Sequence, residues 1–228
     1  MIMDDKIRQE MMLYYDERAE EYDEIYLGKG HTTIDPDVYK KDVAKVAKMV
    51  SNFGKGHLID IACGAGFWLP NYARNCNQIT FLEQSERMLS RCKDRVERLE
   101  LADISNFVQG DFFDVDLASK YDCALVGFLL SHLTFAQEEA FFRKLEEILR
   151  TDSQLMFIDS AWNESRQRYQ EKEGLQERVL NDGRVFRIYK RYFEKSDIKT
   201  MFKRYRFRMK SYYIGEALIA AIAESYCK

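Results

Sequence analysis

The segment 57–68, HLIDIACGAGFW, constrains the fold of this chain more than any other stretch. It opens with a short apolar run whose length and branched side chains are typical of a buried strand. The small residues Ala62–Gly66 follow, and they allow the backbone to turn sharply and a ligand to come close. A helix is expected to start at Phe67 or Trp68. This order of strand, glycine turn and helix N-terminus predicts a pocket of unpaired N–H groups that face a ligand.

A lone Gly-x-Gly is a common pattern and is weak evidence on its own. Acidic residues at the ends of the predicted strands strengthen the interpretation. Asp60 lies near the end of the first apolar run. A second run, 78–82, ends in Glu83, close to the roughly 20-residue offset at which an acidic residue reaches ribose hydroxyls. A third short run, 106–108, is followed closely by Gly110-Asp111-Phe112. Together they favour a nucleotide-like ligand.

In this order the segments resemble the class I S-adenosylmethionine-dependent methyltransferases. The resemblance covers about residues 14–160. It implies an α/β fold with a doubly wound, seven-stranded, mostly parallel Rossmann-like sheet, and S-adenosylmethionine as cofactor, with S-adenosylhomocysteine as product. The matching pieces are the glycine loop Asp60-x-Ala62-Cys63-Gly64-x-Gly66, the ribose segment 81–85 with Met88-Leu89, the adenine segment 110–112, and Tyr121-Asp122 leading into 124–133.

The amino-acid composition limits which other classes of protein this chain can belong to. At 228 residues and 46% apolar content, one globular domain is expected. There is no apolar run of membrane-spanning length, and the charged N-terminus lacks a signal core, so we expect a cytoplasmic protein without a membrane span. The net charge of −3 argues against general nucleic-acid binding. The five cysteines lack CxxC spacing, which predicts reduced, mostly buried thiols and no metal site.

Strand and helix patterns alternate through residue 158, which predicts a parallel sheet with right-handed crossovers. Asn181-Asp182-Gly183 is a turn signal between two strand-like runs and indicates a hairpin. Arg204–Lys210 alternates basic and apolar residues, as a half-buried strand would, and 217–223 is expected to be the last strand. The predicted divisions of the single domain are 1–35 (N-terminal lid), 36–160 (cofactor-binding core), 161–193 (substrate-side insertion) and 194–228 (C-terminal strands).

The lid prediction depends on residues 4–23, where aromatic and charged residues indicate a helix. Residues 15–23 resemble the lid helix of small-molecule members of the family, and 22–31 is similar to amino-sugar N-methyltransferases. In such proteins lid aromatics close over the methionine end of the cofactor. The alternative is that these tyrosines simply pack an amphipathic helix. Gly28 and Gly30 would give the lid a flexible connection.

The resemblance also implies roles for individual residues. Main-chain N–H groups at Gly64 and Gly66 would approach the cofactor, and Asp60 would act near its ammonium group. Glu83 can accept both ribose hydroxyls, and Asp111 can accept from the adenine amino group. Trp68 either packs beside the cofactor or is a core residue. The other cofactor-site candidates are Tyr14, Tyr22, Ala62, Gln84, Met88, Phe112 and Phe128, of which Met88 and Phe112 would sandwich the purine.

Methyl transfer needs a general base only when the accepting atom starts protonated. The candidates are His132, after the fourth strand, and Tyr26 or His31 in the lid. Each of these histidines could equally be structural or exposed. The Asn-Pro-Pro-Tyr type of motif used for base amino groups is absent, since Val126–Leu129 stands there.

The leading hypothesis is therefore methyl transfer to N or O of a small molecule. Three alternatives remain. RNA methylation could use the basic stretch Arg204–Lys210, although such a face is usually only solvated. A protein that binds the cofactor without turnover fits the same motifs. A nicotinamide oxidoreductase fits poorly, because Leu69 stands where its third glycine belongs. The sequence leaves the substrate, the accepting atom and the oligomeric state open.

Overall fold

The computed structural model describes residues 5–27, 29, 34–118, 120–167 and 171–226. Three features considered above lie outside these residues, namely His31, the Gly28 and Gly30 pair, and Cys227. Across the described residues, no helix combines the length and the apolar character that crossing a bilayer requires.

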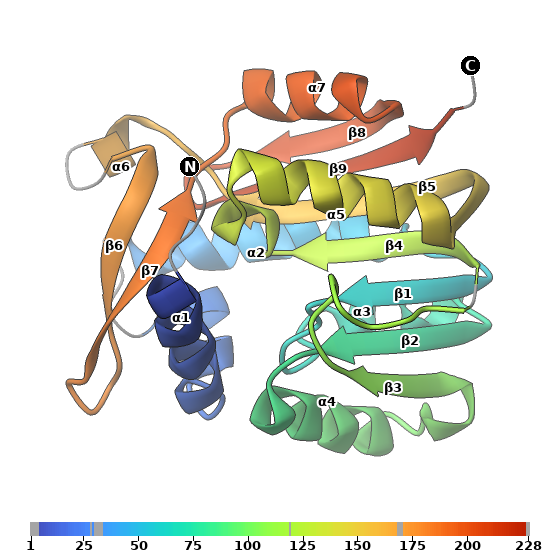
Figure 1. Cartoon of the computed structure of the whole chain (residues 1–228), viewed down its shortest axis with the longest axis horizontal. Helices are drawn as coiled ribbons and strands as arrows, with labels where there is room; N and C mark the ends of the chain where they lie inside the picture. Colours follow the sequence, from blue (N-terminus) through green and yellow to red (C-terminus); the bar gives the residue numbers. More distant parts are fainter. Residues whose placement is uncertain (1–4, 28, 30–33, 119, 168–170, 227–228) are drawn as a thin grey trace.

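A central sheet of seven strands organises the chain, in the order β3-β2-β1-β4-β5-β9-β8 (Figure 1). β9 is antiparallel to its neighbours β5 and β8, and the other pairings are parallel. This is the doubly wound, mostly parallel sheet that the sequence predicts. The strands are β1 (His57–Ile61), β2 (Gln78–Glu83), β3 (Ser105–Gln109), β4 (Tyr121–Gly127), β5 (Leu149–Ser160), β8 (Phe207–Ile214) and β9 (Leu218–Ser225).

Helices cover both faces of the sheet because successive strand residues point to opposite sides. Leu58 belongs to the core under α2 (Pro36–Val50), α3 (Leu69–Tyr72) and α4 (Glu86–Arg98). Ile59 belongs to the core under α5 (Phe135–Ile148) and α7 (Lys195–Arg204). Short 3-10 turns complete the path: η1 (Tyr22–Leu27), η2 (Ala73–Asn75), η3 (Ala102–Ile104) and η4 (Leu130–His132).

Local capping explains where several helices begin. The side chains of Asp35, Ser85 and Thr134 accept hydrogen bonds from main-chain N–H groups at the starts of α2, α4 and α5. The helix expected to start at Phe67 or Trp68 begins at Leu69 instead. Trp68, at its N-cap, offers no side-chain bond, and α3 gives way to η2 after one turn.

The C-terminal segment corrects one prediction. The strand predicted over Arg204–Lys210 starts later, because α7, which begins with a capping box between Glu194 and Asp197, runs through Arg204. Arg206 then adopts a left-handed backbone with φ of 61°, and β8 begins only at Phe207.

Two elements lie beyond the carboxyl ends of β1, β2 and β4, where the arrowheads in Figure 1 point. One is α1 (Asp5–Glu17), which with η1 is called the lid here. The other is a separate two-stranded hairpin of β6 (Glu173–Val179) and β7 (Val185–Arg191), preceded by α6 (Glu164–Gln167). The lid helix ends earlier than the predicted 4–23, because Ala19 turns inward to pack with Ala65 and Met88.

Candidate active site

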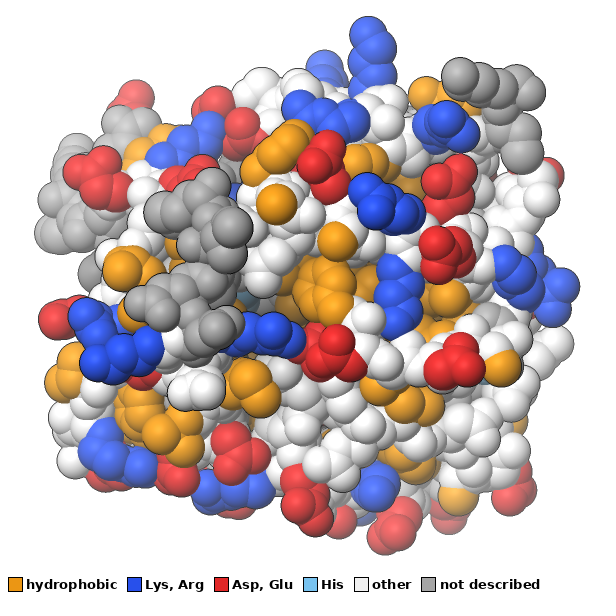
Figure 2. Space-filling model, in the orientation of Figure 1, with side chains coloured by type: hydrophobic (Ala, Val, Ile, Leu, Met, Phe, Trp, Pro, Cys, Tyr) orange, Lys and Arg blue, Asp and Glu red, His pale blue; other side chains and the backbone are white. Residues whose placement is uncertain are grey.

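A cavity of about 380 Å³ opens at this edge of the sheet, between the lid and the strand ends. Figure 2 shows an apolar hollow in the same face, bordered by basic and acidic side chains. The lid contributes Arg8, Met11, Met12, Tyr15 and Tyr22. The predicted residues that line it are Tyr22, Ala62, Gly64, Glu83, Gln84, Met88, Asp111, Phe112, Phe128 and His132.

The glycine turn brings its main chain directly against the lid. Gly64 has a left-handed backbone with φ of 53°, and a Cβ atom there would lie 3.0 Å from the ring of Tyr22. Gly66 also has positive φ, but it packs on α4, where a Cβ would lie 2.9 Å from Sγ of Cys92. Gly64 therefore shapes the cavity, whereas Gly66 sets the approach of α4 to the turn.

Glu83, at the end of β2, is buried and points into the glycine turn. One carboxylate oxygen accepts from N of Gly64 at 3.1 Å, and the other accepts from N of Ser85 at 2.9 Å. Burial raises the pKa of Glu83, and these N–H donors oppose that rise. Each carboxylate oxygen can accept more than one hydrogen bond, so both keep capacity for a ligand's hydroxyl groups.

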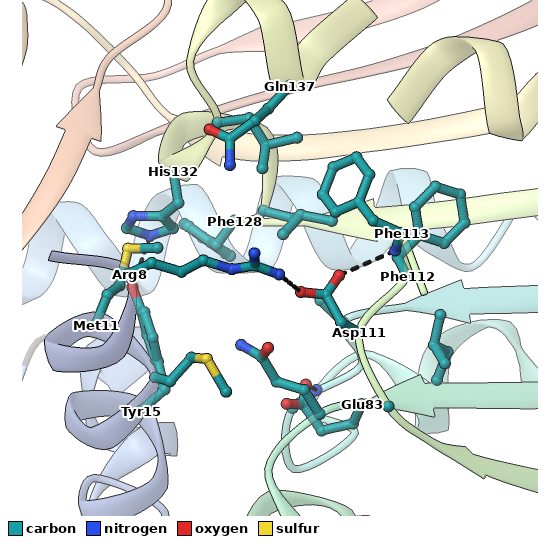
Figure 3. A pocket seen from close by; sticks show the side chains of 18 of the residues that line it. Arg8, Met11, Tyr15, Glu83, Asp111, Phe112, Phe113, Phe128, His132 and Gln137 are labelled. Atoms are coloured by element: carbon teal, nitrogen blue, oxygen red, sulfur yellow. Dashed lines mark hydrogen bonds and ion pairs between the residues drawn. The ribbon is translucent and has the colours of Figure 1, made fainter. Parts of the chain in front are cut away.

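Asp111 closes the other side of the cavity, after β3. Its Oδ1 accepts from N of Phe113 at 2.9 Å, while Oδ2 accepts from the guanidinium of Arg8 at 2.6 Å. Figure 3 shows Arg8 reaching from α1 across the cavity to this carboxylate. The lid thus contacts the carboxylate that the resemblance assigns to the adenine amino group.

A tyrosine and a histidine meet at the cavity wall. Oη of Tyr15 lies 2.6 Å from Nε2 of His132, and Nδ1 of His132 lies 2.7 Å from the carbonyl oxygen of Tyr189 (Figure 3 shows the first two residues). A carbonyl only accepts, so Nδ1 carries the proton, Nε2 accepts, and the Tyr15 hydroxyl donates. Burial and the charge of Lys190 hold the pKa of His132 well below its usual value. Burial raises the pKa of Tyr15 well above the usual value of a tyrosine.

Several predicted site residues lie outside the cavity lining. Asp60 is buried beneath the turn, where it accepts from the hydroxyl of Tyr72 at 2.6 Å, and burial raises its pKa to about 7. Tyr14 packs against Phe186 of the hairpin. Trp68 belongs to the core.

Tyr26, one of the candidate bases, also lies behind the lining. Its ring stacks on Phe67 with centroids 3.9 Å apart and meets the edges of Trp68 and Phe128. Burial raises its pKa. The structure therefore places Tyr26 as support for Phe128.

Arg8, Met11, Tyr15 and Gln137 are among the lining residues that sequence reasoning missed. Helical spacing alone could have grouped three of them, since Arg8, Met11 and Tyr15 lie at i, i+3 and i+7 on one face of α1. Nothing local in the sequence marks that face as pointing toward the strand ends. Among the described residues, no cluster of His, Cys, Asp or Glu could hold a metal ion.

Comparisons with known proteins agree with this geometry. Residues 58–152 match the family model described as a methyltransferase domain. The chain is 28% identical over 115 residues to dTDP-3-amino-3,4,6-trideoxy-alpha-D-glucopyranose N,N-dimethyltransferase of Streptomyces venezuelae. That match covers 50% of this chain but only 44% of the relative, so the chain spans less than half of that protein.

Solved structures resemble the chain over nearly its whole length. A complex of DhpI with SAH has a TM-score of 0.78 at 20% identity and covers 99% of this chain and 100% of that one. A DhpI–SAM–HEP complex has a TM-score of 0.77 at 24% identity, covering 97% and 99%. The 1,6-didemethyltoxoflavin-N1-methyltransferase of Burkholderia thailandensis has a TM-score of 0.67 at 11% identity, covering 100% and 92%. At these identities the likeness is one of fold. The methyltransferase-domain match over residues 58–152 and the strand order agree with the resemblance to the class I S-adenosylmethionine-dependent methyltransferases.

Proposed function

We propose that this chain transfers a methyl group from S-adenosylmethionine to a nitrogen or oxygen atom of a small molecule. The observation that carries the proposal is the convergence of Gly64, Glu83 and Asp111 on one cavity. Its volume of about 380 Å³ falls in the range of small-molecule sites. The N,N-dimethylation named for the Streptomyces venezuelae relative supports a small-molecule acceptor.

The residues present fit the cofactor. Glu83 would hold the ribose hydroxyls with its remaining acceptor capacity, and Asp111 would accept from the adenine amino group. Met88 and Phe112, both buried and both in the lining, would enclose the purine. When bound, S-adenosylmethionine supplies an activated methyl group, so the chain has only to orient the acceptor and exclude water. The lid would exclude water, because it lies over the glycine turn and contacts Asp111.

Tyr15 is the residue that we assign to the acceptor. Its own proton is donated to His132, so its oxygen presents lone pairs to the cavity. It can therefore accept a hydrogen bond from an N–H or O–H of the acceptor and so turn the lone pair of that atom toward the methyl group. His132 is then a positioning residue, because burial and Lys190 oppose its protonation.

The 161–193 insertion would cover the substrate side of the cavity together with the lid. The hairpin in that insertion packs on α1 through Leu180, Phe186 and Ile188, which contact Tyr14. This packing supports the assignment of 161–193 to the substrate side.

The direct test has two parts. Calorimetry with S-adenosylhomocysteine should show one saturable site, and turnover of labelled S-adenosylmethionine against a panel of amines and hydroxy compounds should show methyl transfer. Absence of binding removes the proposal. Binding without transfer to any panel member favours the alternative of a cofactor-binding protein without turnover.

A further inference from the structure

We propose that Arg166, Arg178 and Lys190 form an anion-binding subsite that receives a negatively charged group, phosphoryl or carboxylate, of the methyl acceptor. This inference rests on the proposed function, since it names the substrate class of the same site. The three cations come from α6, β6 and β7, all within the insertion.

The aromatic ring of Tyr192 holds the cations together. Cζ of Arg166 lies 4.6 Å from the ring centroid, and Nζ of Lys190 lies 5.8 Å from it. Nη2 of Arg178 donates to the hydroxyl of Tyr192 at 3.3 Å. Three positive side chains thus surround one ring, although like charges repel at such range.

Carboxylates are too few to balance this charge. Lys190 pairs with Asp159 at 3.3 Å, and Asp159 already accepts main-chain N–H bonds from Ser131 and Ser160. Within the described ranges, neither Arg166 nor Arg178 has a carboxylate oxygen within 4 Å; their hydrogen bonds go to carbonyl, amide and hydroxyl oxygens. A cluster of cations with a single carboxylate is expected to bind an anion.

Burial makes the imbalance costly in the absence of an anion. Arg166 and Lys190 are each only 5% exposed. The Nε atom of Arg166 is buried and has no hydrogen-bond partner among the described residues, so one donor remains for a ligand. Burial, together with the charges of Arg178 and Arg166, lowers the pKa of Lys190 to about 8. A bound anion could accept a hydrogen bond from Nε of Arg166, and its negative charge would offset the repulsion that lowers the pKa of Lys190.

Lys190 lies behind the wall of the cavity where the acceptor would lie, and none of the three cations is itself among the lining residues. Nζ of Lys190 lies 5.8 Å from the ring centroid of Phe128 and 2.6 Å from Oγ of Ser131, the residue next to His132. Phe128 and His132 both line the cavity. Phe128 also has a left-handed backbone with φ of 57°, a strain that is common at ligand sites. A substrate anchored here by its charged end could place its other end beside Tyr15.

The test uses the full chain saturated with S-adenosylhomocysteine. Sodium phosphate and sodium acetate are titrated separately by calorimetry, with sodium chloride adjusted to keep the ionic strength constant. At least one anion should bind saturably to the wild type. Phosphate alone would assign a phosphoryl group to the substrate, and acetate alone a carboxylate; binding of both assigns the anion without choosing between them.

Two arginine variants show whether anion binding depends on this subsite or on positive side chains in general. Arg178→Gln, on the half-buried side of β6, should weaken anion binding at least tenfold, whereas Arg208→Gln, exposed on β8, should change it less than twofold. Lys190→Met should abolish binding where the variant folds, which its melting temperature reports. Lack of saturable binding of both anions by the wild type would overturn the subsite, as would equal affinities of the two arginine variants.

Measurements on the same samples show which of the two proposals fails. If the wild type fails to bind S-adenosylhomocysteine, the proposed function fails, and the anion titration is repeated on the unliganded protein. If it binds S-adenosylhomocysteine normally but neither anion, only the subsite is lost.

Discussion

The hydroxyl of Tyr15 lies 2.6 Å from Nε2 of His132, a contact between residues 117 positions apart in the chain. It joins the lid to the turn after β4, and it fixes the direction of the hydroxyl proton. The phenolic oxygen consequently keeps its lone pairs as acceptors, which the sequence alone does not reveal.

Tyr15→Phe should lower kcat by on the order of tenfold to a hundredfold, because the acceptor loses the group that orients it. The dissociation constant for S-adenosylhomocysteine should change little, as Tyr15 contacts neither Glu83 nor Asp111. Single-turnover rates and calorimetry give the two quantities. A variant as fast as the wild type would show that Tyr15 only packs the lid.

The pH profile distinguishes positioning by His132 from general-base catalysis. The pKa of His132 is held well below its usual value and that of Tyr15 well above, so neither group should titrate between about pH 6 and 9. Asp60 and Lys190, with pKa values of about 7 and about 8, titrate in this range, so we expect kcat for a non-ionising acceptor to follow the same pH profile in the wild type and in His132→Gln. A rise with an apparent pKa near 6.5 in the wild type alone would instead identify His132 as the base.

Glu83→Gln should weaken binding of S-adenosylhomocysteine at least tenfold. Both carboxylate oxygens accept main-chain N–H bonds, and an amide presents an N–H to one of those donors. The cost of such an unsatisfied group is about 1–3 kcal/mol, before any loss of ribose contacts. Glu146→Gln, with a side chain 73% exposed, is the matched control and should bind like the wild type. Equal affinities of the two variants would refute the ribose assignment.

Ion pairs between the lid and α4 should make cofactor release sensitive to salt. Glu20 pairs with Arg91 at 2.6 Å, and Asp23 pairs with Arg95 one helical turn further. Salt screens exposed charges, with a Debye length of about 10 Å at 0.1 M and about 3 Å at 1 M. The dissociation rate of S-adenosylhomocysteine should therefore rise with sodium chloride.

Arg91→Gln, which removes the more exposed of the two pairs, should raise that rate at low salt and reduce its salt dependence. Arg98→Gln is the control on the same helix, because its Nε donates to the carbonyl of Asp94 rather than to the lid. Stopped-flow displacement measures the rates. If the two variants release the ligand equally fast, these ion pairs do not hold the lid closed.

Asp60→Asn should stabilise the fold at neutral pH. Burial raises the pKa of Asp60 from 3.8 to about 7, so the folded state favours the protonated form. The stability that this group contributes is present below about pH 4 and is lost as the pH rises through 7. Asparagine can still accept from Tyr72 without that loss, which amounts to about 1.4 kcal/mol per pKa unit.

Urea unfolding at pH 5 and pH 8 checks this expectation. The gain in unfolding free energy of Asp60→Asn over the wild type should be larger at pH 8. Asp37→Asn, with a side chain 87% exposed, should show no such difference between the two pH values. A gain that shrinks as the pH rises would mean that Asp60 is ionised and stabilising.

The sequence by itself determined the sheet and the residues at the strand ends that line one side of the cavity. Glu83 and Asp111 follow two adjacent parallel strands, and the carboxyl ends of such strands share one edge. Gly64 lies in the turn that follows β1, so its position also depends on the local backbone geometry of that turn. The alternation in Arg204–Lys210 correctly predicted a half-buried strand over 207–210, but it placed the start too early, because α7 runs through Arg204.

Only the tertiary structure decided how the lid, α6 and the hairpin meet the strand ends. Tyr15 meets His132, Arg8 meets Asp111, and Arg166, Arg178 and Lys190 meet around Tyr192 through the packing of the lid, α6 and the hairpin. These contacts join segments that no local pattern relates, and their directions follow from how separate apolar faces are buried together. A charge count shows that the C-terminal region is basic, whereas the fold shows which cations are buried with too few carboxylates.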